Sequence, residues 1–261
     1  GDLPFRDRHS LGVINSINWA RVVAQIVYYF YAAFRVMERT GSSSVRFSVP
    51  TGNFGDIFAG YMAWRMGLPI DRLILATNEN DILARCFASG VYRVGEVAAT
   101  LSPSMDIQVA SNFERYLYYR AEGDAALVRG WMETFRRTSA LALTANQAPL
   151  DDPVMVAGSG DTASTLATIR EIWERHHYLL DPHTAVGVHV ARQRSDRSVP
   201  TICLATAHPA KFGEAIRQAT GDDLAHHPLL DELADRPTRC TQLPASRGAV
   251  AAYLETALNR H

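Results

Sequence analysis

The chain has 261 residues, of which 47% are hydrophobic and 20% charged, the balance of a globular protein with a substantial core. Its formal net charge of −1 excludes a general electrostatic attraction to nucleic acid or to an anionic membrane. No apolar run is as long as a membrane-spanning helix. The three cysteines are widely spaced without a CxxC pair, so we expect no disulfide framework, no metal site and a reducing cytoplasm.

The first half of the chain predicts alternating helices and strands. A helix is expected from Asn15 or Ser16, as capping residues, to about Met37, because apolar residues recur there at helical spacing. Gly41 ends it. A buried strand at 45–50, a glycine-containing turn, a helix at 57–66 and a second strand at 73–77 follow. This order is typical of parallel strands with a right-handed crossover.

The second half repeats the pattern. A helix follows Asn80 or Asp81, residues 95–115 are rich in loops, and 115–143 are largely helical. A strand, a glycine turn and a helix recur at 154–177, a helix follows Pro182, and a strand at 201–205 precedes another helix. Short helices and turns fill 222–261, and no linker between domains is evident. The sequence therefore predicts an α/β fold with a mostly parallel twisted sheet and helices on both faces.

The turn "PTGNFGD" (50–56) has the clearest chemical meaning. A turn between a strand and a helix start offers unpaired backbone N–H groups and the positive end of the helix dipole, which together bind phosphate. Gly52 and Gly55 allow positive φ angles and close approach of a ligand to the backbone. The alternative is that the glycines only make the bend. A similar stretch, "GSGDTAS" (158–164), is better explained by Asp161 as a helix cap, since an acidic cap repels anions.

Other chemistry-bearing residues give weaker signals. Thr206 follows a predicted parallel strand, at the carboxyl edge where such sheets bind ligands, although a hydroxyl there also caps helices. Lys211 is the only lysine among 26 basic residues and is expected in the first turn of the next helix, as a surface residue. The histidine pairs lack the spacing of metal ligands, and no nucleophile motif such as GxSxG is present.

Six segments in order resemble one family. They are "NSINWARVVAQIVYYF" (15–30), "FSVPTGNFGDIFAGYMAWRMGLPI" (47–70), "ATNENDILAR" (76–85), "PSMDI" (103–107), "DPHTAVG" (181–187) and "ATAHPAKF" (205–212). Together they resemble threonine synthase of the bacterial and fungal type. The resemblance implies the tryptophan synthase β-like fold and the cofactor pyridoxal 5'-phosphate (PLP), which acts as an electron sink. It also implies the conversion of O-phospho-L-homoserine and water to L-threonine and phosphate, by γ-elimination and β-addition of water.

The resemblance also implies site residues. It assigns the cofactor phosphate to five turn residues: Gly52, Asn53, Phe54, Gly55 and Asp56. It places Thr206 opposite the pyridine nitrogen, where a neutral hydroxyl need not hold a ring proton. Two residues, Asp181 and His183, are expected near the rim of the active site. Five more are expected to shape the substrate side: Asn78, Asn80, Asp81, Ser104 and Asp106.

The sequence departs from the family at the catalytic lysine. The family carries its Schiff-base lysine in an N-terminal segment that reads "HGPTxxFKD", which this sequence lacks, and Lys211 belongs to a different motif, "AHPAKF". We therefore expect residues 1–261 to be the C-terminal portion of a threonine synthase that works with a missing N-terminal part. No catalytic residue is predicted within the chain, and the isolated chain is expected to be inactive.

Two alternatives remain open. One is another PLP-dependent enzyme of the same fold, a phospholyase or dehydratase. The other is a non-catalytic fragment that binds PLP or phosphate without turnover. A role in binding nucleic acid has little support, because the arginines are scattered and balanced by acidic residues. Helix and strand faces that should meet the missing part predict self-association.

Overall fold

The computed structural model describes residues 2–12, 15–233 and 236–258. The chain divides into two compact units, Gly1–His226 and His227–His261. The sequence analysis found no evident linker between domains, whereas the structure separates the two units between His226 and His227. The second unit contains the short helices α10 (Pro228–Asp231) and α11 (Arg247–Leu258), as predicted for this end of the chain.

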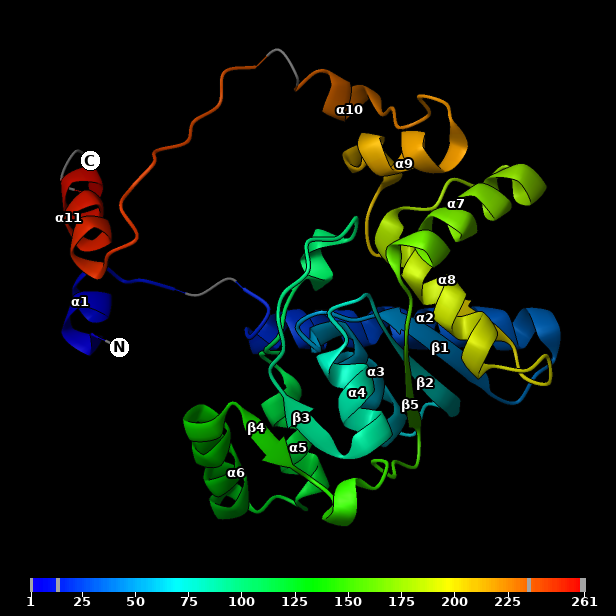
Figure 1. Cartoon of the computed structure of the whole chain (residues 1–261), viewed down its shortest axis with the longest axis horizontal. Helices are drawn as coiled ribbons and strands as arrows, with labels where there is room; N and C mark the ends of the chain where they lie inside the picture. The colour runs from blue at the N-terminus through cyan, green and yellow to red at the C-terminus, as the bar shows by residue number, and fades with distance from the viewer. Residues whose placement is uncertain (1, 13–14, 234–235, 259–261) are drawn as a thin grey trace. The chain divides into compact units, whose positions relative to one another are not determined.

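A four-stranded parallel sheet forms the centre of the first unit (Figure 1). Its strands are β1 (Val45–Pro50), β2 (Ile70–Thr77), β5 (Met155–Ser159) and β6 (Thr201–Cys203), in the order β5-β2-β1-β6. Every residue of β1 is buried, because β1 pairs with β2 on one side and β6 on the other. Parallel strands of this kind end at one edge, where the following turns meet.

Helices cover both faces of this sheet. Phe47 and Leu73 point into a core shared with α2 (Trp19–Thr40), α3 (Gly55–Arg65) and α4 (Ile82–Ser89). The next residues along each strand face the other way, since side chains alternate. Ile74 packs against α8 (Pro182–Arg194), and the Ser48 hydroxyl donates to the Gly187 carbonyl at 2.6 Å. Outside α8 lie α7 (Thr162–His176) and α9 (Gly213–Thr220). The predicted fold class is confirmed.

A small antiparallel sheet was missed by the sequence analysis. It pairs β3 (Val91–Arg93) with β4 (Ala140–Ala142) next to α5 (Phe113–Arg120) and α6 (Ala125–Thr138). The expectation that 115–143 is helical therefore fails at its end, where Ser139 adopts φ 55° and stops α6. Three-residue strands are too short for an alternating pattern to show.

Several element ends differ from expectation. The side chain of Asn18, rather than Asn15 or Ser16, caps α2 by accepting from the Ala20 N–H. Lys211 lies in a short 3-10 helix, η3 (Pro209–Lys211), ahead of α9. Asp161 caps α7 as predicted. The remaining short elements are α1 (Leu3–Arg8), η1 (Pro103–Met105) and η2 (Ala145–Gln147). Among the described helices, none has the length and apolar character needed to cross a bilayer.

Candidate functional site

A cavity of about 240 Å³ lies where β1 ends and the turn to α3 begins. It brings together all six residues predicted to bind the cofactor, with Ser104 from the predicted substrate side. It is lined by Ser16, Arg21, Gln25, Pro50, Thr51, Gly52, Asn53, Phe54, Gly55, Asp56, Ser104 and Thr206. These residues come from four separate parts of the chain, which only the folded structure joins.

The turn after β1 is shaped by Phe54 and not, as expected, by positive φ angles at its glycines. Phe54 adopts φ 63°, a left-handed conformation, and forms the N-cap of α3. Its ring is buried against the rings of Phe113 and Tyr116, with centroid distances of 5.3 and 5.5 Å. This packing compensates for the unfavourable backbone angle. Gly52 and Gly55 do not have positive φ angles.

Gly52 is needed instead for close approach. A Cβ atom built on it would lie 2.5 Å from the carbonyl oxygen of Ser104. No side chain fits at that distance, so the segment around Ser104 packs directly on the turn backbone. The glycine therefore defines one side of the cavity through its missing side chain.

The turn presents free hydrogen-bond donors. In the described part of the chain, no backbone hydrogen bond uses the N–H of Gly52, Asn53, Phe54 or Gly55, and α3 has no side-chain cap. These donors lie at the positive end of the α3 dipole, where anions bind. The turn therefore has donors of the kind that bind phosphate, and its role as a phosphate cradle stays a prediction.

Asp56 is the one acidic group in this cradle, and it is engaged elsewhere. Its carboxylate accepts from the hydroxyls of Tyr28 and Tyr29 at 2.5 and 2.9 Å. Burial raises the pKa of Asp56 above its ordinary value, although the two hydroxyl donors partly oppose the shift. Asp161 differs, because donors of Ser164 lower its pKa.

Ser16, Arg21 and Gln25 line the cavity but were missed by the sequence analysis. The sequence analysis used the spacing of the apolar residues in this segment and its capping residue. The polar residues between them add nothing to that spacing, so these three were not singled out. Asn112 ties this segment to the turn: its side-chain amide donates to the carbonyls of Ser16 and Asn53 at 2.9 and 3.0 Å. Arg21, which is exposed, adds a positive charge beside the cradle.

A neighbouring cavity of about 460 Å³ shares Gln25, Asp56 and Thr206 with the first. The rest of its lining is Tyr28, Tyr31, Ala32, Leu204 and Ala205. Thr206 thus borders both spaces, as expected for a residue that faces a ligand. Lys211 lines neither of these two cavities.

The predicted substrate-side amides serve to hold a loop. Asn78 and Asn80 are buried, and both donate to the Asp106 carboxylate, at 2.7 and 3.0 Å. Asn80 also donates to the Ala98 carbonyl at 2.9 Å. These bonds fasten the long segment 94–112 to the end of β2, and neither amide lines the cavity of the cradle. Only Ser104 of this predicted group does.

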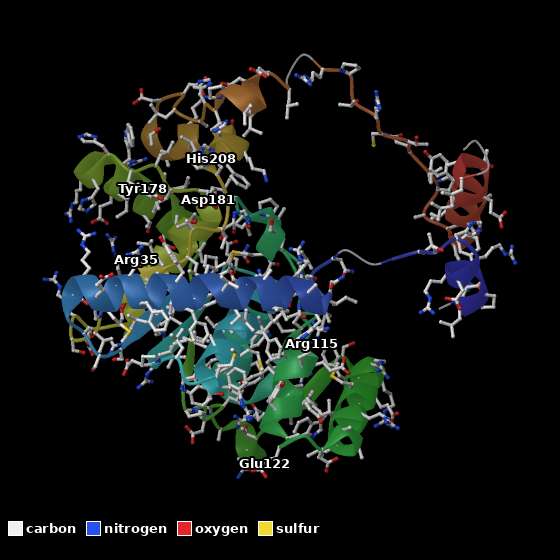
Figure 2. All side chains as sticks on the ribbon, turned by 180° about the vertical axis from the view of Figure 1, so that it is seen from behind. Arg35, Arg115, Glu122, Tyr178, Asp181 and His208 are labelled. Atoms are coloured by element: carbon white, nitrogen blue, oxygen red, sulfur yellow. The ribbon has the colours of Figure 1, made fainter. Side chains whose placement is uncertain are left out.

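The structure does not bring Asp81 to the cradle. Its carboxylate pairs with Arg85 at 2.7 Å, and it lines a cavity of about 390 Å³ beside β5. Asp181 and His183, expected at the rim, are buried at the start of α8, where Figure 2 labels Asp181. Burial by itself would raise the pKa of Asp181, but donors from His183 and Thr184 outweigh it and lower the pKa.

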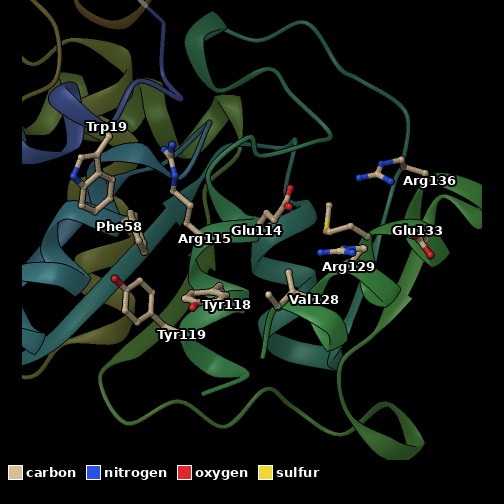
Figure 3. A pocket seen from close by; sticks show the side chains of 12 residues that line it. Trp19, Phe58, Glu114, Arg115, Tyr118, Tyr119, Val128, Arg129, Glu133 and Arg136 are labelled. Carbon is tan, nitrogen blue, oxygen red and sulfur yellow. The ribbon is translucent and has the colours of Figure 1, made fainter. Parts of the chain in front are cut away.

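A larger cavity, of about 770 Å³, lies away from the predicted site (Figure 3). Trp19, Phe58 and Tyr119 form its aromatic end, while Arg129, Glu133 and Arg136 lie at the other end. None of the residues predicted to bind the cofactor or the substrate lines it. It is an open surface groove rather than an anion cradle.

Comparison with known proteins identifies the family. The family model described as "Threonine synthase, C-terminal" matches residues 184–254. The chain is 45% identical over 244 residues to threonine synthase of Saccharomyces cerevisiae, covering 84% of this chain and 46% of the relative. It is 44% identical over 252 residues to that of Pseudomonas aeruginosa, covering 96% and 53%.

A solved structure agrees. The PLP-bound threonine synthase from Brucella melitensis superimposes with a TM-score of 0.86 at 44% identity, covering 98% of this chain and 55% of that one. The chain thus spans about half the length of the relatives it matches. Sequence identity, fold and the order of the six quoted segments lead to the same conclusion: the chain belongs to the threonine synthase family.

Proposed function

We propose that this chain forms the part of a threonine synthase that binds the phosphate of PLP. The carrying observation is the cavity in which the backbone N–H groups of residues 52–55 meet the start of α3 beside Arg21. Within the part of the chain that the structure describes, these four groups make no backbone hydrogen bond. The PLP-bound state of the Brucella melitensis relative supports this assignment. A phosphate group fits the cradle because Gly52 lets the backbone approach closely and Asp56 is held by two tyrosine hydroxyls.

The proposed reaction converts O-phospho-L-homoserine and water to L-threonine and phosphate. When bound, PLP supplies an electron sink for the carbanion chemistry. The residues of this chain bind the cofactor and orient it. The turn N–H groups hold the cofactor phosphate, and Thr206 offers a neutral hydroxyl that need not hold a proton on the pyridine nitrogen. Arg21 balances the charge of an anionic group in the same cavity.

The reaction also needs a lysine amine as covalent partner of the cofactor and as general base. Lys211 is the only lysine of this sequence and lines neither cavity at the site. We propose that residues 1–261 act as the C-terminal portion of the enzyme, with the lysine supplied by an N-terminal part. The greater length of the relatives supports this proposal. The chain by itself is then expected to be inactive.

A second candidate is a non-catalytic PLP-binding polypeptide. The cradle favours this second candidate, because the residues that line the cavity belong to this chain and include no lysine. A cytoplasmic location is proposed with either function, supported by the free thiols of Cys86, Cys203 and Cys240.

The first test adds PLP to the purified chain, reduces with borohydride and maps the modified peptide. We expect saturable binding that inorganic phosphate displaces, with no specific label on Lys211. Pyridoxal, which lacks the phosphate, is the matched control and should bind much more weakly. Stoichiometric labelling of Lys211, or equal binding of both compounds, would contradict the proposed site.

The second test distinguishes the candidates. The chain is mixed with a polypeptide that carries the N-terminal family segment, and products from phosphohomoserine and from threonine are compared. Threonine formation supports the synthase. Ketoacid formation from threonine supports a dehydratase, and PLP binding without turnover supports the non-catalytic alternative.

A further inference from the structure

His183 connects α8 to the wall of the cradle. His183 is 4% exposed, and its Nδ1 lies 3.0 Å from Oδ1 of Asp181. Its Nε2 accepts a hydrogen bond from the Ser104 N–H at 3.3 Å. The ring of Phe212 packs edge-on at a centroid distance of 5.1 Å. The imidazole is therefore fixed on three sides.

These contacts define its protonation. A backbone N–H can only donate, so Nε2 must be the unprotonated nitrogen, and the ring proton sits on Nδ1 and is donated to Asp181. In a doubly protonated ring, Nε2 would also carry a hydrogen and would point it at the Ser104 N–H, so this hydrogen bond could not form. The contact with Ser104 therefore requires a neutral imidazole.

Ser104 transmits this contact to the cradle. Its carbonyl oxygen is the atom that a Cβ on Gly52 would meet at 2.5 Å, and Ser104 itself lines the cavity. Displacing the Ser104 peptide would therefore move one wall of the cavity relative to the turn. His183 does not line this cavity, so it acts through Ser104.

The Asp181 carboxylate is also linked, through Thr184, to a second wall of the cavity at Thr206. The Thr184 hydroxyl donates to Oδ2 of Asp181, and it accepts from the Thr206 N–H at 3.3 Å. One buried carboxylate thus orients two donors, each of which holds a different backbone segment at the cavity. Hydrogen-bonded networks of this kind act as a unit.

We propose that Asp181, His183 and Thr184 form a positioning unit that sets the opening between Ser104 and Thr206, and that it holds Ser104 only while the imidazole is neutral. This role rests on the proposed function of the cavity as the cofactor site. His183 and Thr184 contact backbone groups of the wall, and Asp181 contacts His183 and Thr184, so the unit acts by positioning.

The surroundings of the ring hold few charges. Asp181 faces Nδ1 from the cap of α8, and the 102–106 segment presents only the Ser104 N–H. Asp106, in the same segment, accepts from Asn78 and Asn80 instead. Among the hydrogen bonds and ion pairs of the described residues, none joins the ring to Lys211, which precedes Phe212. Among the described residues, Asp181 is therefore the acidic group in hydrogen-bond contact with this ring.

The test measures hydrogen exchange of single amides by NMR in the full 261-residue chain. In His183→Phe, protection of the Ser104 amide should fall about tenfold, the order expected for losing one buried hydrogen bond. The affinity for PLP should fall in parallel. His183→Gln, whose amide oxygen can accept from Ser104, should keep both. His189→Phe, on the same helix with its ring against Gln193, is the control.

Unchanged Ser104 protection in a folded His183→Phe variant would overturn the proposal. Thr184→Val gives a second, independent check if that variant does not fold. In Thr184→Val, the Thr206 amide should lose protection against hydrogen exchange and the Ser104 amide should keep it. Unchanged protection of the Thr206 amide would contradict the part of the proposal that concerns Thr184. Failure of the wild-type chain to bind PLP would reject the proposed function alone, because the amide measurements need no cofactor.

Acidification checks the requirement for a neutral ring. The imidazole resonances of His183 and the Ser104 amide are followed together as the pH is lowered. Loss of Ser104 protection as the ring becomes doubly protonated supports the requirement. A ring that becomes charged while Ser104 stays protected contradicts it.

Discussion

Gly52 and the carbonyl oxygen of Ser104 are in direct contact, since a Cβ atom at residue 52 would lie 2.5 Å from that oxygen. The atom in the way is backbone, which cannot swing aside as a flexible side chain can. Gly52→Ala is therefore expected to push the Ser104 segment off the turn. We expect a loss of stability of about 1–3 kcal/mol, the usual cost of overpacking, and an affinity for PLP lower by about tenfold or more.

Gly130→Ala is the matched control for this prediction. Gly130 lies in α6, and nothing comes within 4 Å of a Cβ atom built there. Alanine should be neutral or stabilising at that position, because it favours helix. Urea unfolding and PLP titration of both variants provide the measurement. Equal effects of the two substitutions would contradict the steric role of Gly52.

Arg21 lines the cradle cavity from the first turns of α2. Arg21→Ala should weaken binding of PLP and of inorganic phosphate about tenfold at low salt, because a charged donor is lost. The difference from wild type should shrink as salt is raised, since the side chain is exposed and its charge is screened. Arg39→Ala, in the last turn of the same helix, should leave affinity unchanged. A salt-independent loss would argue against an electrostatic role.

Asp56 predicts a pH dependence whose sign follows from its raised pKa. A carboxyl group whose pKa is higher in the folded state stabilises the fold below its unfolded pKa, and this contribution is lost as pH rises through the folded pKa. In Asp56→Asn the contribution is absent. The stability of the variant relative to wild type should therefore increase with pH over that interval. Denaturant melts at several pH values measure it.

The exposed Asp151 offers a control for this experiment. Asp151→Asn removes a carboxylate at the surface and should change the free energy of unfolding little. A stability difference between Asp56→Asn and wild type that stays constant, or decreases, with rising pH would show that burial does not dominate at Asp56.

One face of α2 exposes apolar side chains, among them Val23 at 47% and Val27 at 66%. Figure 2 shows α2 running along the surface nearest the viewer, with Arg35 toward one end. Contiguous apolar surface of this kind drives association. The chain should therefore self-associate with increasing concentration, and Val23→Glu with Val27→Glu should reduce this in light scattering. Leu127→Glu on α6 is the control. A wild-type chain that stays monomeric at high concentration would contradict the prediction.

The sequence alone determined the local units of this protein. The strand at 45–50, the turn after it and the helix that follows were predictable, because side-chain period, glycine and capping act within a few residues. The turn was also recognisable as a candidate phosphate cradle, since its donors all lie in one short segment. Asp161 as a cap of α7 was predictable for the same reason.

Only the tertiary structure decided which distant residues meet. Arg21, Gly52, Ser104 and Thr206 line one cavity although long stretches of chain separate them. The same packing buries His183 and turns it toward the Ser104 backbone, whereas the family resemblance placed it near the rim of the active site. Short-range patterns carry no information on such contacts, because these depend on the sheet order and on how α2 and α8 cover its two faces. The turn after β1 is therefore local in origin, whereas the cavity around it is a product of the whole fold.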